Sequence, residues 1–500
     1  MARVVVLHPP DAAERILVPR DDALVREHDE GGGRYRMDDG PFRSYERTVT
    51  TRDDGQLEEH VDFRVATRFW GLLFVPPLRR AFAAHDRDHM PWWAPPQRLD
   101  ERAASILGLL LTVSIVGGYL GTLITQTLTY VGDEFGTDIG GQKNVLSAVR
   151  ASIVLLVPLA ALADRLGRRR LISLTAGLGC VATATGAFVP SLLGYGISQT
   201  VARGFASALI VLIAILSAEE MPAGSRAWSY SLIALTQGLG AGICVWFLPF
   251  ADDSARAWRA LYLLPLLMLP LVLIVARTLP ESRRFVATHV DAPIAGHGRR
   301  FALLAVSGFL LAVYATPSSQ LGNEFLNDAR GFSASRVALF TVLTVTPATI
   351  GVIVGGKLAD VRGRRVVGAV GIVGGTLLSV ATYASAGWTM WVASTMSSVI
   401  AGAVVPALGV YRPELFPTSL RGRAGGVLEG VQVLGAVAGL QLVGGLVDAG
   451  HSYSSAFGVA AIAPMAVAVL ILVAFPETAH RSLEELNPED RSPAPSRETG

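Results

Sequence analysis

The charged side chains Arg203 and Glu429 stand inside long apolar stretches of the sequence. An uncompensated charge buried in hydrocarbon costs several kcal/mol, so charges in such places indicate function. Arg203 lies about twelve residues, or roughly 18 Å of helix, from the outer end of its stretch, near the middle of a membrane. A guanidinium there can bind a carboxylate or phosphate through two hydrogen bonds, or tune a neighbouring acid during proton transfer. The alternative for Arg203 is an anchor between helices, and Glu429 is either a proton carrier or part of a charged latch.

Uncharged polar and aromatic side chains in the same stretches complete a candidate binding site. The expected substrate-binding residues are Arg203, Tyr119, Gln126, Gln237, Tyr314, Gln320, Trp391 and Gln432. Gln237 and Gln432 recur at the spacing of an internal repeat described below, which favours both facing one central axis. The uncharged residues outside this pair are individually compatible with helix packing.

Charged residues near the ends of the apolar stretches form a second set, which we interpret as a latch. Asp164 and Asp360 can each cap a helix N-terminus, whose partial positive charge favours a carboxylate. The arginines of the same loops can pair with glutamates at helix ends and hold one side of the molecule shut. The alternative is a static network that only fixes the topology. The expected coupling and gating residues are Asp164, Arg168, Arg169, Glu219, Arg226, Glu281, Asp360, Arg364, Arg365, Glu414, Arg421, Glu429 and Glu477.

Other chemistry has little support in the sequence. No loop of the type Gly-x-x-x-x-Gly-Lys-Ser/Thr occurs, and we find no nucleophile with a matching base. Cys180 and Cys244 lie in apolar runs, which suits small core residues. His85 and His89 are four residues apart, as zinc ligands on a helix can be, but no third ligand is evident. We therefore expect no enzyme activity, no metal and no cofactor.

The composition indicates a membrane protein. Of 500 residues, 51% are hydrophobic and 17% charged, and the mean hydropathy is +0.43. The formal net charge of +2 is too small to imply a nucleic-acid partner.

Residues 1–100 are expected to form an extension outside the membrane. They are rich in Asp, Glu and Arg and contain no run of about 18 to 20 apolar residues. Alternating patterns on both sides of Arg52-Asp53-Asp54-Gly55 predict a β-hairpin. The run FWGLLFVPPLRRAF is typical of an amphipathic helix at the membrane surface, although a small cap packed on the helices would fit as well.

Twelve later runs are long enough to cross a hydrocarbon core of about 30 Å as helices. The predicted spans are 104–130, 144–163, 171–190, 192–218, 228–250, 259–279, 301–325, 337–359, 366–386, 388–410, 425–447 and 455–475. Arginines concentrate in the loops after the second, eighth and tenth spans, which places these loops in the cytoplasm. With an even number of spans, both termini lie inside, and the expected location is the cytoplasmic membrane of a bacterium.

The membrane part repeats itself at an interval of about 195 residues. Asp164-Arg165-Leu166-Gly167-Arg168-Arg169 returns as Asp360-Val361-Arg362-Gly363-Arg364-Arg365, and Pro280-Glu281 returns as Pro476-Glu477. Glu219, Pro222 and Arg226 return as Glu414, Pro417 and Arg421. Several matches in register indicate two homologous six-helix halves in parallel orientation.

The repeated loop resembles a known family signature. Gly356-Lys357-Leu358-Ala359-Asp360 through Arg365 is similar to the Gly-x-x-x-Asp-Arg-x-Gly-Arg-Arg loop of the major facilitator superfamily. PESRR at 280–284, YRPELFPT at 411–418 and PETAHRSLEEL at 476–486 further resemble its sugar-porter and metabolite-symporter branches. The resemblance covers residues 103–486, and it implies a gating role for the latch. Leu120 stands where the sugar-porter pattern often has Asp, so the usual first-helix proton carrier is absent.

The sequence therefore predicts an all-α membrane protein with twelve transmembrane helices and a small N-terminal extension of a β-hairpin and an amphipathic helix. The expected divisions are 1–100, 101–280, 281–299 as a cytoplasmic central loop, 300–478, and 479–500 as a polar tail. The expected function is secondary active transport of a small organic solute, an organic anion or a sugar-like metabolite, by proton-coupled symport. The alternatives are a drug or metabolite exporter and a transporter-like sensor that signals through the extension. The expected partners are the solute, protons and the lipid bilayer, and the protein is expected to be monomeric.

Overall fold

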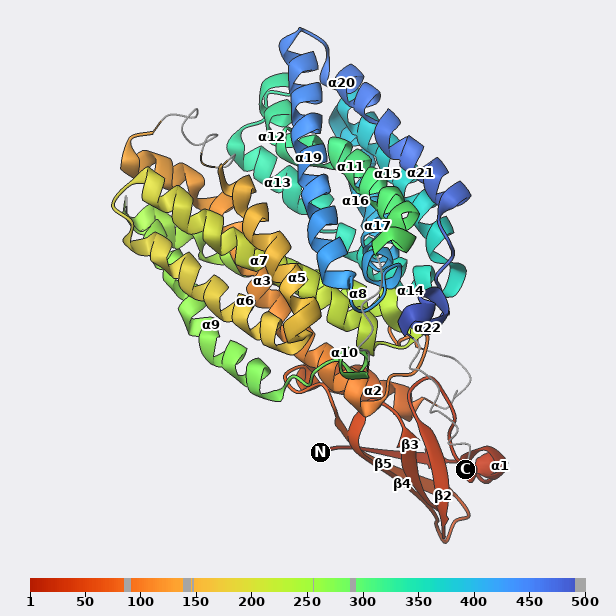
Figure 1. Ribbon diagram of the computed structural model, residues 1–500. Helices are drawn as coiled ribbons and strands as arrows, with labels where there is room; N and C mark the ends of the chain where they lie inside the picture. The colour runs from red at the N-terminus through yellow and green to blue at the C-terminus, as the bar shows by residue number, and fades with distance from the viewer. Residues whose placement is uncertain (85–90, 138–144, 146–147, 255, 288–293, 491–500) are drawn as a thin grey trace, which may run out of the picture.

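Long apolar helices dominate the computed structural model, which describes residues 1–84, 91–137, 145, 148–254, 256–287 and 294–490 (Figure 1). Within these residues, eleven helices are long and apolar enough to cross a membrane. They are Glu101–Phe135, Arg168–Phe188, Leu192–Glu220, Ala223–Ala251, Trp258–Thr278, Gly298–Ala329, Ser335–Arg362, Arg364–Ala384, Gly387–Glu414, Arg421–Asp448 and Tyr453–Ala474. These eleven correspond to the predicted spans other than the second, part of which lies outside the described residues.

The first group of helices begins after the extension. Its members are α3 (Glu101–Phe135), α5 (Ile153–Leu166), α6 (Arg168–Thr185), α7 (Leu192–Glu220), α8 (Arg226–Phe247) and α9 (Trp258–Thr278). The carboxylate of Asp100 caps α3 by accepting the N–H of Ala103 at 2.6 Å. The same helix ends at Gly136, whose φ of 63° is the left-handed conformation common after helices.

The second group contains more broken helices. It consists of α11 (Gly298–Gln320), α13 (Ala334–Val345), α14 (Ala348–Arg362), α15 (Arg364–Ala384), α16 (Gly387–Gly402), α17 (Val404–Gly409), α18 (Tyr411–Glu414), α19 (Arg421–Asp448), α20 (Tyr453–Ala460) and α21 (Ile462–Ala474). Pro347 separates α13 from α14, because proline lacks the N–H that would continue the ladder. Short segments complete the chain: α10 (Arg283–Ala287), α12 (Gly322–Glu324), a π-helix at Phe325–Ala329 and α22 (Leu483–Leu486).

The two groups meet where α5 packs against α19 and α8 packs against α14 and α17. We call this line of contact the seam. In Figure 1 the groups converge at the seam and spread apart toward the top of the view. The packing is close: a Cβ added to Gly422 on α19 would lie 1.9 Å from the carbonyl oxygen of Ala160 on α5.

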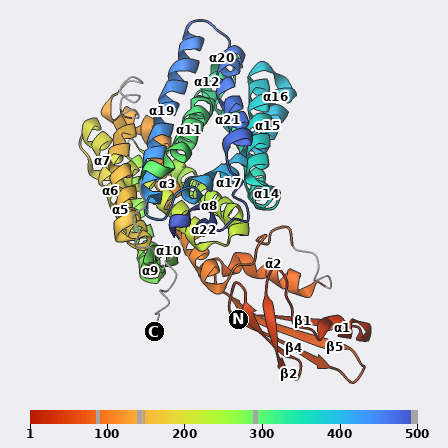
Figure 2. The ribbon, with the colours of Figure 1, turned by 45° about the vertical axis from the view of Figure 1, so that its right-hand side comes forward.

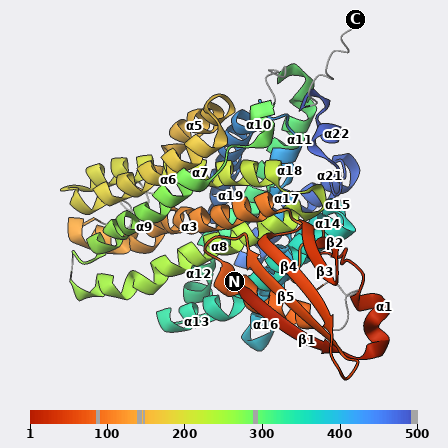
Figure 3. The same cartoon turned by 90° about the horizontal axis from the view of Figure 1, so that it is seen from below.

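A five-stranded antiparallel sheet forms the extension, with strand order β1-β5-β4-β3-β2. The strands are β1 (Ala2–His8), β2 (Arg26–Gly31), β3 (Arg34–Asp39), β4 (Phe42–Thr51) and β5 (Leu57–Val65). The pair β4 and β5 is the predicted hairpin, closed by the N–H of Arg52 on the carbonyl of Gln56 at 2.9 Å. The prediction of an all-α protein with one hairpin was wrong in extent, because the strands β1, β2 and β3 complete a sheet. Figure 3, seen from below, shows the strands side by side in front of the helices.

Helix α2 (Gly71–Ala83) joins the sheet to the bundle. Leu78 and Phe82 are buried against the sheet, whereas Arg79 and Arg80 are exposed, so the helix is amphipathic as predicted. Just before it, Trp70 donates from Nε1 to the carbonyl of Gly108 and the hydroxyl of Thr112 on α3, at 3.1 and 3.0 Å. The extension is thus fixed to the first helix group, below the bundle in Figure 2.

Candidate functional site

Asp164, near the end of α5, caps a helix of the opposite group. Its carboxylate accepts the backbone N–H groups of Gly422 at 2.9 Å and Arg423 at 3.0 Å, in the first turn of α19. Helix α19 has no capping side chain at its own N-cap residue. The first group therefore supplies the cap that α19 lacks, across the seam.

Asp360, near the end of α14, makes the equivalent contact in the other direction. It accepts the N–H groups of Ala227 at 3.2 Å and Trp228 at 2.8 Å, in the first turn of α8. The N-cap residue of α8 also makes no side-chain capping bond. The two caps are therefore exchanged between the groups, as the internal repeat requires.

Glu219 connects the two groups through a buried ion pair. Its carboxylate lies 3.1 Å from Arg168 of its own group and 2.9 Å from Arg421 of the other. All three side chains are fully buried. A carboxylate so placed stabilises the closed seam only while both guanidinium groups are in reach.

Glu414 makes the matching pair from the second group. It binds Arg364 of its own group and lies 3.1 Å from Arg226 of the first group. Arg364 also contacts Asp360 at 3.2 Å, just as Arg168 lies 3.5 Å from Asp164. We call the caps and the pairs centred on Glu219 and Glu414 the latch.

Two glycines in the repeated loops leave room for a carboxylate beside the latch. Gly167 and Gly363 have φ values of 96° and 99°. A Cβ on Gly167 would lie 2.3 Å from Oε2 of Glu281, and one on Gly363 would lie 2.7 Å from Oε2 of Glu477. Glu281 accepts the N–H of Arg168 at 2.8 Å, so this carboxylate holds the start of α6.

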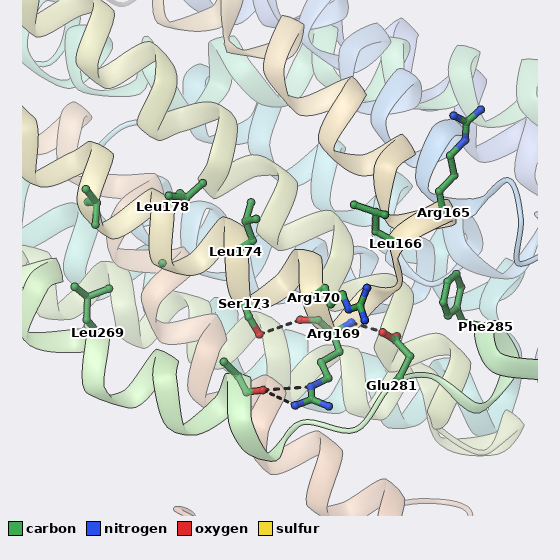
Figure 4. A pocket seen from close by; sticks show the side chains of 13 residues that line it. Arg165, Leu166, Arg169, Arg170, Ser173, Leu174, Leu178, Leu269, Glu281 and Phe285 are labelled. Atoms are coloured by element: carbon green, nitrogen blue, oxygen red, sulfur yellow. Dashed lines mark hydrogen bonds between the residues drawn. The ribbon is translucent and has the colours of Figure 1, made fainter.

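The side chains of Arg169 and Arg365 bind carbonyl groups within their own halves of the bundle. Arg169 donates to the carbonyl of Ala276 at 3.2 and 3.0 Å (Figure 4), and Arg365 donates to the carbonyl of Leu472. Neither guanidinium reaches across the seam in this structure.

The C-terminal segment packs under the latch, which the expected polar tail did not anticipate. Asp490 lies 2.9 Å from Arg421 and accepts the N–H of Thr418 at 2.8 Å. Asn487 donates to the carbonyl of Glu414 at 2.8 Å. Arg421 therefore has an additional carboxylate partner that its counterpart in the repeat, Arg226, does not have among the described ion pairs.

Glu484 in α22 holds the C-terminal segment to Arg284 of α10, which connects the two helix groups in the sequence. It accepts from Arg284 at 2.9 Å. Burial opposes its charge, but a hydrogen bond to its own backbone and the Arg284 guanidinium together lower the pKa of Glu484. The pair stays charged across the neutral range.

Residues 91–97, between α2 and α3, cross the seam, and we call them the strip. Lys357 on α14 donates to the carbonyls of Pro91 at 3.0 Å and Trp92 at 2.9 Å. The carbonyl of the next residue, Trp93, accepts from the indole of Trp228 on α8 at 3.3 Å. Adjacent residues of one strip are thus held by opposite helix groups.

Gln97 then secures the strip to the first group. Its side-chain oxygen accepts the N–H of Gly224 at 2.7 Å, and its backbone N–H and carbonyl both bond Ser225 Oγ at 2.8 Å.

A polar cluster lies beside the latch, because Arg412 stands two residues before Glu414 on the short helix α18. Arg412 on α18 contacts Glu429 on α19 at 2.6 Å and Gln432 at 2.5 Å. Arg203 on α7 donates to the carbonyl of Gly121 on α3, and Glu429 is close enough to act on it electrostatically. Arg412 and Glu429 remain 29% and 33% exposed, so solvent reaches this pair. We call Arg203, Arg412, Glu429 and Gln432 the central cluster.

Arg412 was not among the predicted site residues. Its position directly after the apolar run 388–410 indicated a loop arginine of the kind that orients the chain in a membrane. In the structure it belongs to the short helix α18, which turns it toward α19. No repeat partner marks this position, since Ser217 occupies the equivalent site.

The predicted tyrosines lie in packed regions. Tyr119 is fully buried and donates to the carbonyl of Leu261 at 2.8 Å. Tyr314 is 7% exposed and packs edge-on against Phe457, with ring centroids 6.0 Å apart. Neither is placed in the central cluster.

The remaining predicted binding residues are dispersed. Trp391 stacks edge-on with Phe340 at 4.8 Å between ring centroids. Gln320 is exposed at the end of α11, and Gln126 and Gln237 are partly exposed on α3 and α8. The histidine pair at 85 and 89 lies outside the described residues.

Comparison with known proteins identifies the fold. Residues 301–498 match the model of the Major Facilitator Superfamily. No curated protein matches the sequence significantly.

Solved structures match across both helix groups. A structure of the proton:xylose symporter XylE bound to 6-bromo-6-deoxy-D-glucose is 18% identical, with a TM-score of 0.65, covering 77% of this chain and 98% of that one. The E. coli fucose:proton symporter FucP is 14% identical, with a TM-score of 0.62, covering 75% and 100%. The human organic anion transporter MFSD10 is also 14% identical, with a TM-score of 0.59, covering 74% and 99%. The family model matches the second helix group, and the fold of these solved structures matches most of the chain. This protein therefore resembles the transporters of the major facilitator superfamily.

Proposed function

We propose that this protein is a secondary active transporter that moves a small organic solute by rocking its two helix groups around the central cluster. The exchanged caps carry this proposal: each group supplies the carboxylate that the other group's helix needs, and among the described residues these caps lie at one end of the bundle. Contacts of this kind are made in one conformation and broken in the other, as alternating access requires.

The latch is the proposed cytoplasmic gate. When the gate opens, Asp164 and Asp360 must release the helix ends of α19 and α8, whose N–H groups then bind water. Arg168 and Glu219 stay together within one group, whereas Glu219 and Arg421 separate. The pairs that cross the seam therefore determine how strongly the gate is held.

The central cluster is the proposed site of solute and proton binding. The guanidinium of Arg203 suits an anionic or hydroxyl-bearing solute, because it presents several donors in one plane. Glu429 can take up a proton, and its bond to Arg412 would then weaken, which links protonation to rearrangement of the cluster. The similarity to sugar:proton symporters and to an organic anion transporter supports a solute of this kind.

The proposed topology has twelve spans, with α5 and the residues before it as the second. The arginine-rich seam end faces the cytoplasm, as the positive-inside rule favours, and both termini lie there. The proposed divisions are 1–100, 101–280, 281–299, 300–478 and 479–500, in the cell membrane.

A transporter-like sensor is the second candidate, favoured by the strip that crosses the seam. Lys357 holds this strip to the second group, so an extension that binds a partner would respond to the state of the gate. Deleting residues 1–95 separates the two functions: a sensor would keep its solute flux and lose signalling.

The test of transport uses purified protein in proteoliposomes with an imposed pH gradient. Labelled sugars and organic acids are screened for accumulation, and Glu429→Gln and Arg412→Gln are compared with wild type. The matched control is Arg256→Gln, which removes an arginine that is 81% exposed and remote from the cluster. We expect Glu429→Gln to lose accumulation driven by the gradient while exchange persists, and Arg256→Gln to behave as wild type. Full accumulation by Glu429→Gln, or no flux of any solute above empty vesicles, would overturn the proposal.

A further inference from the structure

A groove runs along the outer face of the first helix group, between α6 and α9. Its volume is about 1020 Å³, and it lies outside the latch and the central cluster. Arg165 and Arg170 line one end of the groove, which we call its mouth, and Leu174, Leu178 and Leu269 line its length (Figure 4). Val181 lines the groove as well.

The lining forms an apolar stripe on one face of α6. Leu174, Leu178 and Val181 are 45%, 43% and 46% exposed, at spacings that place them on one side of a helix. Gly177 lies within this stripe, and a Cβ added to it would meet nothing within 4 Å, so the groove is open at its middle. From Arg170 to Val181 the stripe is about 16 Å long, at 1.5 Å per residue.

The mouth of the groove has unused positive charge. Arg165 and Arg170 are exposed, and within the described part of the chain neither forms an ion pair or a side-chain hydrogen bond. Glu281 also lines the groove, but its carboxylate already accepts the N–H groups of Arg168 at 2.8 Å, Arg169 at 3.2 Å and Ser282 at 3.0 Å. The mouth therefore favours an anion despite this carboxylate.

The repeat shows that the latch does not require these arginines. The equivalent positions in the second group are Val361 and Val366, although the latch residues themselves are duplicated. The basic mouth is thus a feature of one half only.

We propose that this groove binds one anionic phospholipid, with the phosphate at the end that Arg165 and Arg170 line and an acyl chain along the stripe. The inference rests on α6 crossing a membrane, as the proposed function has it. An apolar stripe on that helix then lies at the depth of the acyl chains, beside a charged mouth at the depth of the headgroups. Arginines at such a surface attract the headgroups of anionic lipids. The apolar stripe adds a contact with the acyl chain, which headgroup attraction alone does not provide.

Lipid binding is measured by native mass spectrometry of the full chain in detergent, titrated with palmitoyl-oleoyl phosphatidylglycerol or phosphatidylcholine. We expect one phosphatidylglycerol bound ahead of any others, and weaker binding of phosphatidylcholine. Each arginine lost should weaken binding about five-fold, so Arg165→Gln/Arg170→Gln should weaken it about 25-fold. The matched control is Arg362→Gln, an exposed arginine of the equivalent loop in the second group, which should leave binding unchanged.

A second variant tests the acyl-chain contact without removing charge. Gly177→Leu places a side chain in open space, so it should fold, yet it fills the groove and should weaken phosphatidylglycerol binding at least ten-fold. The proposal would be overturned if both lipids bind equally well, or if Arg362→Gln weakens binding as much as the loss of a groove arginine does. Either result would show that lipids respond only to the general surface charge. A change of oligomeric state in Gly177→Leu without lipid preference would assign the groove to a contact between two copies. The readout involves no flux, so these outcomes are independent of failure to find a transported solute.

Discussion

Replacing Asp164 with alanine should loosen the whole seam, including the second cap, in which Asp360 holds the first turn of α8. The change removes the cap on the first turn of α19, which that helix cannot replace from its own N-cap residue. Loss of an N-cap costs about 0.5–2 kcal/mol, and loss of a carboxylate at a helix N-terminus about 0.3–1 kcal/mol more. Both contacts exist only in the closed seam, so the equilibrium should shift toward opening by about 1–3 kcal/mol, or roughly 5- to 150-fold.

The assay is amide hydrogen exchange at Ala227 and Trp228, which Asp360 caps at the other side of the seam. Their partners are unchanged in Asp164→Ala, so faster exchange there reports movement of whole helix groups. We expect an acceleration of roughly 5- to 150-fold, and the reciprocal effect at Gly422 when Asp360 is replaced.

The control is Asp448→Ala, which removes an exposed carboxylate from the end of α19 away from the latch. It should leave exchange at the seam unchanged. If Asp164→Ala accelerates exchange only at the residues it caps, while Ala227 and Trp228 stay protected, the caps are local and the gating role is refuted.

Three further substitutions test single contacts. Gly167→Ala combines a positive φ with a Cβ placed 2.3 Å from Glu281, so it should destabilise the protein by more than the roughly 1–3 kcal/mol of backbone strain alone and lower the Tm in detergent; an unchanged Tm would contradict the crowding. Asp490→Asn weakens charge-assisted bonds worth about 1.5–3 kcal/mol each and should expose the tail to limited proteolysis, whereas unaltered cleavage would show that the tail is held by its apolar contacts. Trp70→Phe keeps an aromatic ring but removes the indole N–H, so the free energy of opening of α2 should fall by about 0.5–1.5 kcal/mol and its amide exchange should become faster; unchanged exchange would show that packing alone holds this helix.

The features that the sequence predicted well are those that repeat or extend. Long apolar runs mark spans because only a helix satisfies the backbone in hydrocarbon. The latch residues stood out because Asp164, Glu219 and Arg226 recur in register as Asp360, Glu414 and Arg421. Duplication alone did not show which charges cross the seam, since Arg169 and Arg365 are also duplicated and bind within their own halves.

Features that depend on tertiary contacts were missed. Strand β2 reads REHDEG, with one buried residue, so it carries no alternating signal for a strand. Glu27, that buried residue, is held by Arg47 at 2.7 Å, a contact between strands that spacing cannot reveal. The tail looked polar, yet Leu483 and Leu486 are buried under the bundle. Tyr119 and Tyr314 lie in packed regions, and their binding role stays a prediction, because a buried aromatic and a ligand-binding aromatic look alike in one sequence.

The strip after α2 leaves the extension no slack when the seam opens. Trp92 is held by Lys357 from one helix group and Trp93 by Trp228 from the other, and consecutive Cα atoms are only about 3.8 Å apart. If α8 and α14 separate by more than a few ångström, either the Lys357 contact or the Trp228 contact with the strip must therefore break. Lys357 lets go first, because the strip is also pinned to the first group by Gln97. In the proposed transport cycle, opening of the gate would free the ammonium of Lys357, and its reactivity toward an amine-specific reagent would then report how often the gate opens.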